Sequence, residues 1–220
     1  MKFDLHIHSS FSPDAINAPD AICRAAIRKS LGGIALTDHD TTAGWEEMQK
    51  AAERAGLLFI PGVEQKVVVR GQVVGEVLCL FLRESVRSHN MSEILAEVEA
   101  QGGLVVAAHP FDHRRPALGR SGVIMEHLHR IALEVLNGRS YTGEGNRQAE
   151  ACAEAHRRPV TAGSDAHTPF EVGNVCIEAE VGTVEELRRA IRGRKVRVTG
   201  RVSHPVFSLY SGMRKLGFGR

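Results

Sequence analysis

The 220-residue sequence contains few aromatic residues, with one Trp and two Tyr. It has no apolar run close to the ~20 residues that span a bilayer, and it does not open with a basic segment followed by an apolar one, so we expect no secretion. The net charge of +2 is too small for a strong nucleic-acid footprint. We therefore expect a cytoplasmic protein that makes no membrane contact.

The cysteines are few and unpaired in sequence. Cys23, Cys79, Cys152 and Cys176 lie far apart and form no C-x-x-C spacing, which argues against a structural zinc knuckle and a disulfide scaffold. The abundant residue is histidine, with 11 copies. Because aromatic residues are scarce, the many histidines suggest a catalytic or ligand-binding role more than a role in packing.

Short apolar runs alternate with amphipathic stretches along the chain. The pattern predicts strands over 3–7, 34–37, 57–60, 104–108, 131–136, 160–162, 175–179 and 196–199, and helices over 19–31, 45–55, 93–100, 147–155 and 184–191. Residues 66–82 alternate around Arg70-Gly71, which predicts an inserted β-hairpin. Repeated β/α units indicate an α/β domain with a mainly parallel sheet, closed as a barrel.

Residues that can bind metals follow successive predicted strands. They are His6 and His8, then Asp38 to Asp40, then Glu64, His109, Glu134 to Asn137, and finally Asp165 and His167. Because the carboxyl ends of the strands share one face of a β/α barrel, we expect these side chains to converge in one pocket. Each member alone could be structural, but the series together favours a functional site.

The ligand types indicate which metals would bind. Imidazole and carboxylate groups without thiolates suit Zn, Mn or Fe, and they disfavour all-oxygen Mg or Ca sites. Two or more clustered divalent ions are the usual means of hydrolysing phosphate esters, because they hold the attacking and leaving oxygens and activate water.

Six motifs carry a resemblance to a known family. They are Asp4-Leu5-His6-Ile7-His8-Ser9, Thr37-Asp38-His39-Asp40, Pro61-Gly62-Val63-Glu64, Ala108-His109-Pro110, Glu134-Val135-x-Asn137 and Gly163-Ser164-Asp165-Ala166-His167. In this order they resemble the polymerase-and-histidinol-phosphatase (PHP) family, in its stand-alone metal-dependent phosphoesterase form. The resemblance covers residues 1–180. It implies a distorted (β/α)7 TIM-like barrel, one domain over residues 1–220, and two or three divalent metal ions.

The resemblance also implies which residues hold the metals. The sets are His6, His8, Glu64 and Asp165 for one metal, Asp14, His39 and His167 for another, and Glu64, His109 and the residue at the end of the fifth strand for a middle metal. Three-metal members of the family have a histidine at that last position, where this sequence has Asn137. An amide is a poor ligand for Zn or Mn, so the middle site would be weak or empty and His109 could contact substrate instead.

The reaction that the resemblance implies is attack of a metal-bridging hydroxide on phosphorus, with the metals neutralising the developing charge. Asp165 and His109 would act in the catalytic centre. His113 follows the His109 loop and could protonate the leaving group.

Other charged residues near the motifs have two interpretations. Arg114 and Arg115 could pair with the substrate phosphate or could be solvated charge, and Arg139 is a weaker candidate of the same kind. Asp4 and Asp40 could orient ligating imidazoles or could cap turns at the strand ends.

We expect hydrolysis of a phosphate monoester on a small molecule, which would be the main partner. One alternative is a phosphodiesterase or exonuclease acting on nucleotides or nucleic-acid ends, and another is a non-catalytic partner module with a residual metal site. A basic C-terminal extension over 192–220 bears on the nuclease alternative, although solvated charge is its more ordinary interpretation. Its basic residues are Arg192, Arg194, Lys195, Arg197, Arg201, Arg214, Lys215 and Arg220.

Overall fold

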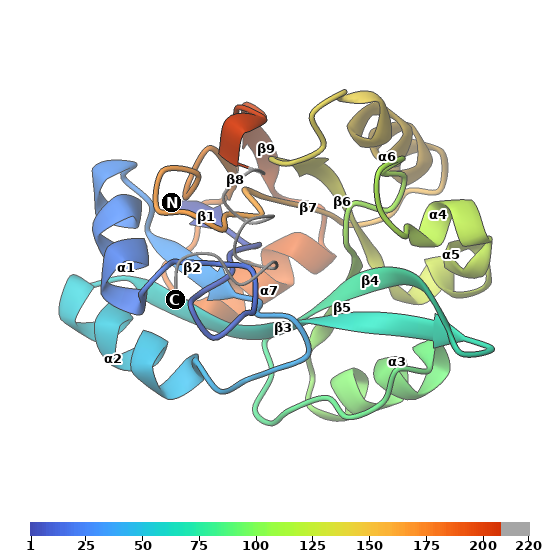
Figure 1. The fold of residues 1–220 in the computed structure, drawn as a ribbon, viewed down its shortest axis with the longest axis horizontal. Helices are drawn as coiled ribbons and strands as arrows, with labels where there is room; N and C mark the ends of the chain where they lie inside the picture. The colour runs from blue at the N-terminus through green and yellow to red at the C-terminus, as the bar shows by residue number, and fades with distance from the viewer. Residues whose placement is uncertain (208–220) are drawn as a thin grey trace.

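A nine-stranded sheet curls into a nearly closed barrel in the computed structural model of the protein, which describes residues 1–207 (Figure 1). The strands are β1 (Lys2–Asp4), β2 (Gly33–Leu36), β3 (Leu58–Val69), β4 (Gln72–Leu80), β5 (Leu104–Ala107), β6 (Ala132–Asn137), β7 (Val160–Gly163), β8 (Val175–Glu178) and β9 (Arg197–Gly200). The helices are α1 (Pro19–Arg28), α2 (Trp45–Ala55), α3 (Met91–Ala100), α4 (Leu118–Ser121), α5 (Val123–His127), the 3-10 helix η1 (Leu128–Arg130), α6 (Glu144–Ala155) and α7 (Val184–Arg192). Within these described residues, no helix is both long and apolar enough to cross a bilayer.

The order of the strands accounts for the barrel. Neighbouring strands follow the order β7-β6-β5-β4-β3-β2-β1-β8-β9, and all of them except β4 and β8 run in the same direction. A parallel bridge between Ile7 and Ala166 joins the chain after β1 to the chain after β7. The prediction of a distorted, mostly parallel TIM-like barrel is confirmed.

The hairpin predicted at 66–82 forms part of the barrel wall. β3 and β4 pair antiparallel, and β4 pairs in turn with β5. Arg70 and Gly71 form the two-residue turn with φ values of 51° and 78°, and positive φ at both central positions is typical of a type I′ turn. The strand predicted at 57–60 and the first arm of the hairpin are therefore one continuous strand.

The remaining elements follow the predicted pattern with shifted ends. The helix predicted at 45–55 has those bounds, and it ends at Gly56, whose φ of 68° is left-handed. β1 ends at Asp4, earlier than predicted, because the chain beyond it pairs only through the bridge at Ile7. The bounds of the short helices over 118–130 were not predicted, since segments of this length are too short to show a helical period, although a helix around His127 and His129 was expected.

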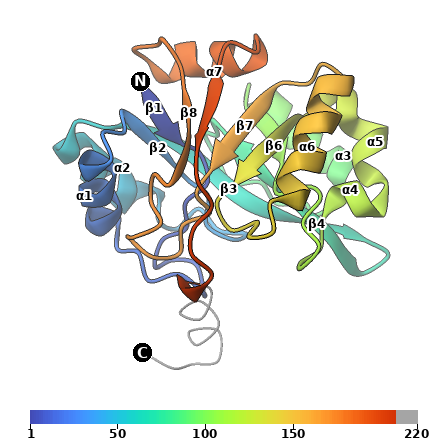
Figure 2. The same cartoon turned by 90° about the horizontal axis from the view of Figure 1, so that it is seen from above.

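Apolar side chains fill the barrel and leave one end open for a site. Phe3, Ile60 and Val106 are buried in one cluster with Leu187 and Ile191 of α7. α7 thus covers the end of the barrel at which β1 begins (Figure 2). The carboxyl ends of the parallel strands lie at the opposite end, where barrels of this kind carry their active sites.

Candidate metal centre

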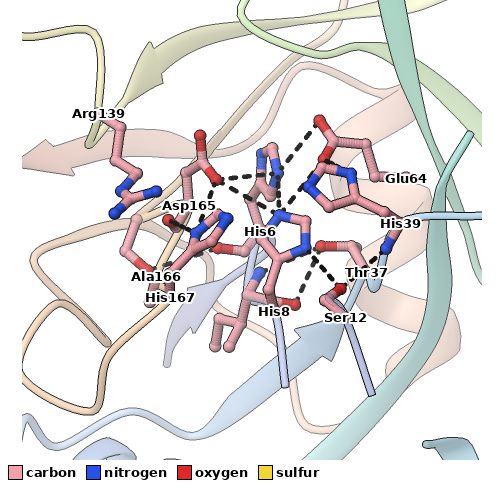
Figure 3. Close-up of polar contacts among 12 residues, drawn as sticks. His6, His8, Ser12, Thr37, His39, Glu64, Arg139, Asp165, Ala166 and His167 are labelled. Carbon is pink, nitrogen blue, oxygen red and sulfur yellow. Dashed lines mark hydrogen bonds and ion pairs between the residues drawn. The ribbon is translucent and has the colours of Figure 1, made fainter. Parts of the chain in front are cut away.

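Four of the predicted ligand side chains, from the segments after β1 and β7 and from within β3, meet at one point (Figure 3). Nε2 of His6 lies 3.1 Å from Nε2 of His8. The Glu64 carboxylate lies 3.4 Å from the first nitrogen and 3.3 Å from the second, and Oδ1 of Asp165 lies 3.6 and 3.4 Å from them. All four side chains are buried. The structure therefore brings together the complete set that we predicted for one metal.

The set predicted for another metal lies beside the first. Oδ2 of Asp14 is 3.6 Å from Nε2 of His39 and 3.4 Å from Nε2 of His167. The ring of His8 lies 4.4 Å from each of these two imidazoles, measured between centroids. Nδ1 of His39 is 3.0 Å from Oε2 of Glu64, so the two sets adjoin at the Glu64 carboxylate.

A carboxylate that the sequence analysis missed completes a third group of ligand-type atoms. Oε2 of Glu76 lies 3.6 Å from Nε2 of His109, and its Oε1 lies 3.7 Å from Nδ1 of His39. The same His109 nitrogen is 3.0 Å from Oε1 of Glu64. The side chains of Glu64, Glu76 and His39 each offer one ligand atom within 4.8 Å of the others. The sequence of the hairpin could have identified Glu76, because it is a lone carboxylate in an apolar strand. The pairing of the two strands places it on the same face as Glu64.

Asn137 stands where three-metal members of the family have a histidine, and both atoms of its side-chain amide are engaged by neighbouring residues. Its Nδ2 donates hydrogen bonds to Oε2 of Glu134 (3.0 Å) and Oδ2 of Asp165 (3.2 Å). Its Oδ1 accepts from Arg115 Nη2 at 3.1 Å and from the Arg139 backbone at 2.9 Å. Because both amide atoms are engaged in this way, Asn137 holds neighbouring side chains in place, and Glu76 is the group that faces His109.

Glu134 is the carboxylate that orients ligand-type imidazoles. Its Oε1 lies 2.9 Å from Nδ1 of His6, and its Oε2 accepts the backbone N–H of His109 at 2.8 Å. Asp4 and Asp40 were the candidates for this role, with turn capping as the alternative, and among the described residues neither forms a hydrogen bond or ion pair with the ring of a ligand-type histidine. Asp4 accepts hydrogen bonds from the Ser164 hydroxyl and backbone instead, and Asp40 binds the backbone and side chain of Lys66. Both carboxylates therefore hold the chain at a strand end against a segment that is distant in the sequence.

The residues at the strand ends explain the positions of the Asp165 and His109 side chains. A Cβ on Gly163 would lie 2.3 Å from Cβ of His6, so only glycine lets β7 approach the segment after β1 this closely. The backbone N–H of Asp165 then donates to the His6 carbonyl at 2.8 Å. Asp165 and His109 have φ values of 55° and 31°, a region that non-glycine residues rarely occupy and that is enriched at functional sites.

The electrostatics of the pocket fit bound cations. Oε2 of Glu64 and Oδ1 of Asp165 are buried, and neither has a hydrogen-bond partner among the described residues. Burial raises the pKa of both carboxyls, but the Arg115 guanidinium and the nearby imidazoles outweigh it and hold the pKa well below the usual range. Burial, together with the neighbouring His8, lowers the pKa of His167 to about 4. Divalent metals bind ionised carboxylates and neutral imidazoles, so Glu64, Asp165 and His167 already have the binding form, whereas His6 and His39, whose pKa burial lowers less than the neighbouring carboxylates raise it, would each release a proton when a metal binds.

The other predicted site residues lie in the segment that follows the His109 loop. Arg115 donates to Oδ2 of Asp165 at 2.8 Å and to Oδ2 of Asp112 at 3.2 Å, so it contacts the metal-type cluster directly. The Arg114 guanidinium lies over the Tyr141 ring at 5.3 Å. His113 is exposed, and its Nε2 is 3.7 Å from the Glu144 carboxylate.

The remaining arginines are partly engaged in structural contacts. Arg139 donates to Oε1 of Glu171 at 3.0 Å and lies beside Asp165 and His167 in Figure 3. Arg192 donates to the backbone carbonyls at 102 and 103, and Arg197 pairs with Glu178. Arg214, Lys215 and Arg220 lie outside the described residues.

The barrel and its histidine–carboxylate clusters define a metal-dependent phosphoesterase of the PHP type. The PHP domain family matches residues 4–156, and the PHP-associated family matches residues 143–196. The chain therefore belongs to the PHP family, and its relatives include named phosphatases and exonucleases, which are hydrolases acting on phosphoric ester bonds. The resemblance that the six motifs carry is confirmed.

Individual relatives cover different parts of the chain. An uncharacterized protein of Methanocaldococcus jannaschii is 31% identical over 193 residues, which is 84% of this chain and 73% of the relative. A 3′,5′-nucleoside bisphosphate phosphatase of Chromobacterium violaceum is 47% identical over 66 residues, covering 30% of this chain and 23% of that one. A 5′-3′ exoribonuclease of Escherichia coli is 32% identical over 108 residues, covering 43% and 36%.

Solved structures share the fold. A two-domain protein of Bacteroides vulgatus containing a PHP-like metal-dependent phosphoesterase superposes with a TM-score of 0.73 at 18% identity. The match covers 97% of this chain and 69% of that chain. At this level of identity the likeness supports the barrel architecture.

Proposed function

We propose that the protein hydrolyses phosphate monoesters of small molecules with two or three divalent ions. The observation that carries the proposal is the sharing of one buried carboxylate, Glu64, by three groups of ligand-type atoms. His6, His8 and Asp165 would complete one site, and His39 with Asp14 and His167 another. Glu76 and His109 would complete the middle site. The imidazole–carboxylate donor set suits Zn, Mn or Fe.

Bound divalent ions supply activated water at neutral pH and compensate negative charge on phosphoryl oxygens. The chain's own residues prepare the place for this chemistry. Glu134 fixes the ring of His6, and Asn137 with Arg115 holds Asp165 through its second oxygen. Arg115 lies close enough to the cluster to donate to a phosphate there, which a planar guanidinium does in a bidentate manner.

The protonation of the leaving group needs a donor near the rim. We retain His113 as the candidate, because it is exposed and lines the same cleft as Arg115, which contacts the metal-type cluster. An exposed imidazole can deliver a proton near neutral pH and recover it from solvent. Replacement with glutamine should reduce kcat for substrates with poor leaving groups more than for those with good ones.

A second candidate function is phosphodiester hydrolysis on nucleotides or nucleic-acid ends. The named relatives include both a bisphosphate phosphatase and an exoribonuclease, and a cleft lined by arginines lies beside the metal-type cluster. A panel of monoesters, diesters and oligonucleotides, run with Mn and with Zn, separates the two. Salt-insensitive release of phosphate from small monoesters supports the first function, whereas oligonucleotide cleavage that falls steeply with salt supports the second.

Asp165 offers the sharpest variant for testing the proposed site. Asp165→Ala should abolish turnover, and Asp165→Asn should do so with less disturbance, because asparagine tolerates the left-handed backbone found there. We expect a loss above about 100-fold, with an unchanged far-UV spectrum. Glu126→Gln, at an exposed helical position, serves as the matched control. Full activity in the Asp165 variants would contradict the site, and protein purified without bound transition metal would favour the non-catalytic module.

A further inference from the structure

The chain that follows β9 extends toward the open end of the barrel. Residues 201–207, which we call the C-terminal strap, come directly after β9 and lie beyond the residues matched by either family. Figure 2 shows this part of the chain in dark red, running away from α7 toward the opposite end of the barrel. The strap is therefore directed to the end that holds the metal-type cluster.

The C-terminal strap is bound to the loops that follow β6 and β7. The backbone N–H of Ser203 donates to the carbonyl of Gly138 at 2.7 Å. Ser203 is buried, and its Oγ accepts a hydrogen bond from Nδ2 of Asn174 at 3.1 Å. At the end of the strap the ring of Phe207 stacks on that of Phe170, with centroids 6.3 Å apart. The strap thus holds together two loops that flank the metal-type cluster.

Arg139 connects the C-terminal strap to a buried carboxylate. Its Nη2 donates to the carbonyl of Phe207 at 3.1 Å, and its Nε donates to Oε1 of Glu171 at 3.0 Å. Glu171 is fully buried, and only 9% of the Arg139 side chain is exposed. Because the guanidinium is planar and its donors have fixed relative directions, it holds the two acceptors at a fixed separation.

Glu171 in turn holds the backbone at His167. Its Oε2 accepts the backbone N–H of His167 at 3.1 Å, and the backbone N–H and hydroxyl of Thr168 at 3.0 and 3.1 Å. Nδ1 of His167 lies 2.9 Å from the carbonyl of Asp165, which leaves Nε2 to face Asp14 at 3.4 Å. The Glu171 carboxylate therefore fixes the backbone from which this imidazole projects.

We propose that Arg139 and Glu171 are positioning residues through which the C-terminal strap holds His167 in place for the metal ion at the set of Asp14, His39 and His167. The inference rests on the proposed function and adds to it a segment that contributes no ligand. Losing a contact that orients a metal-binding histidine typically costs about 10- to 100-fold in metal affinity. Loosening the strap should therefore weaken the binding of one divalent ion more than that of the others.

Hydrogen exchange of the metal-depleted protein tests this link without metal or turnover. Neither Arg139 nor Phe207 contacts the backbone amides of His167 and Thr168 directly. We expect Arg139→Gln and Phe207→Ser each to accelerate exchange at these two amides at least about tenfold, because local opening becomes easier. Val202→Thr, at an exposed position of the same strap, should leave both rates unchanged. Wild-type exchange at the two amides in both variants would overturn the proposal.

Competition for Zn with a chelating dye tests the consequence for the metal centre. We expect Arg139→Gln to weaken one Zn ion at least about tenfold, with the other ions bound as in wild type. Arg139→Lys should weaken the same ion, because an ammonium group keeps the charge but lacks the planar fork. Wild-type affinity in both variants, or full rescue by lysine, would overturn the proposal. A protein that shows the expected loss of Zn affinity but hydrolyses no phosphate ester would contradict the proposed function alone.

Discussion

Glu64 and Glu76 extend from adjacent strands toward the same imidazole nitrogen. Nε2 of His109 lies 3.0 Å from Oε1 of Glu64 and 3.6 Å from Oε2 of Glu76. Burial, followed by the charge of Glu64, raises the pKa of Glu76. Two carboxylates held this close in a buried pocket repel each other unless a proton or a cation lies between them, and a divalent ion would relieve the repulsion.

Replacement of Glu76 tests whether it is a metal ligand. Glu76→Gln should remove about one bound divalent ion per chain, because the amide is a poor ligand for Zn or Mn and the neighbouring Asn137 is already engaged. Metal content after dialysis against a weak chelator measures the effect, with Glu126→Gln as the control. Retention of the full metal content by Glu76→Gln would show that Glu64 and His109 suffice at the middle position.

Glu134 should influence metal binding without touching the metal. Glu134→Gln keeps the size of the side chain, but it removes the charge that fixes His6 and one acceptor of the His109 backbone. Losses of about 10- to 100-fold in metal affinity are typical of such supporting contacts. Activity should therefore fall at limiting Mn and recover at excess Mn. An Asp165→Asn protein in the same titration should not recover, which separates a supporting residue from a ligand.

The sequence predicted much of this site because strand ends and ligand types are local features. His6, His8, His39 and Asp165 follow short apolar runs, and barrel topology alone brings such positions together. Glu76 was missed because it lies within a strand, so only the pairing of β3 with β4 places it beside Glu64. The role of Glu134 was missed for a similar reason. Its partners are 25 and 128 residues away in the chain, and no sequence period links them.

The cleft lined by Arg114, Arg115 and Arg120 is even harder to predict from the sequence, because it is formed by tertiary contacts. The short helix α4 was not predicted, and α4 with the segment before it packs against β4 to form the arginine-lined cleft. Sequence alone left Arg114 and Arg115 equivalent. The fold separates them, because Arg115 contacts Asp165 whereas Arg114 lies over Tyr141. Side-chain direction in a loop is decided by such packing, which has no signature in the sequence.

Asn137 should contribute to stability more than to metal coordination. In Asn137→Asp, a carboxylate would replace the amide that donates to Glu134 and Asp165, so three acidic groups would meet in a buried pocket. We expect a loss of roughly 3 kcal/mol in the free energy of unfolding of metal-depleted protein. Asn137→Ala should lose less, because it removes the donor without adding charge. Fluorescence of Trp45, the only tryptophan, reports the unfolding in urea.

If Asn137→Asp instead lost less free energy of unfolding than Asn137→Ala, the new carboxylate would have captured a cation or a proton in the pocket. Repeating the unfolding at pH 5 and pH 8 distinguishes them, because a shared proton is lost at the higher pH while a tightly bound metal remains.

Histidine titration tests the electrostatics of the metal-depleted pocket. Burial and the charge of His8 lower the pKa of His167 to about 4. For His6 and His39, burial also lowers the pKa, but their carboxylate neighbours outweigh it, and the pKa lies well above 6.5. Nitrogen-detected NMR of the imidazoles should therefore show a neutral His167 at pH 5.5 beside protonated rings of His6 and His39.

The shift of His167 also has a defined effect on stability. Between pH 4 and 6.5 the unfolded state binds more protons at this residue than the folded state, so its contribution to stability increases as pH rises through that range. The lowered pKa of His167 makes the free energy of unfolding about 3 kcal/mol larger above pH 6.5 than below pH 4. His167→Gln cannot titrate, so the free energy of unfolding of wild type minus that of the variant should increase across this range. A difference that is flat with pH would show that His167 keeps its ordinary pKa in the folded protein.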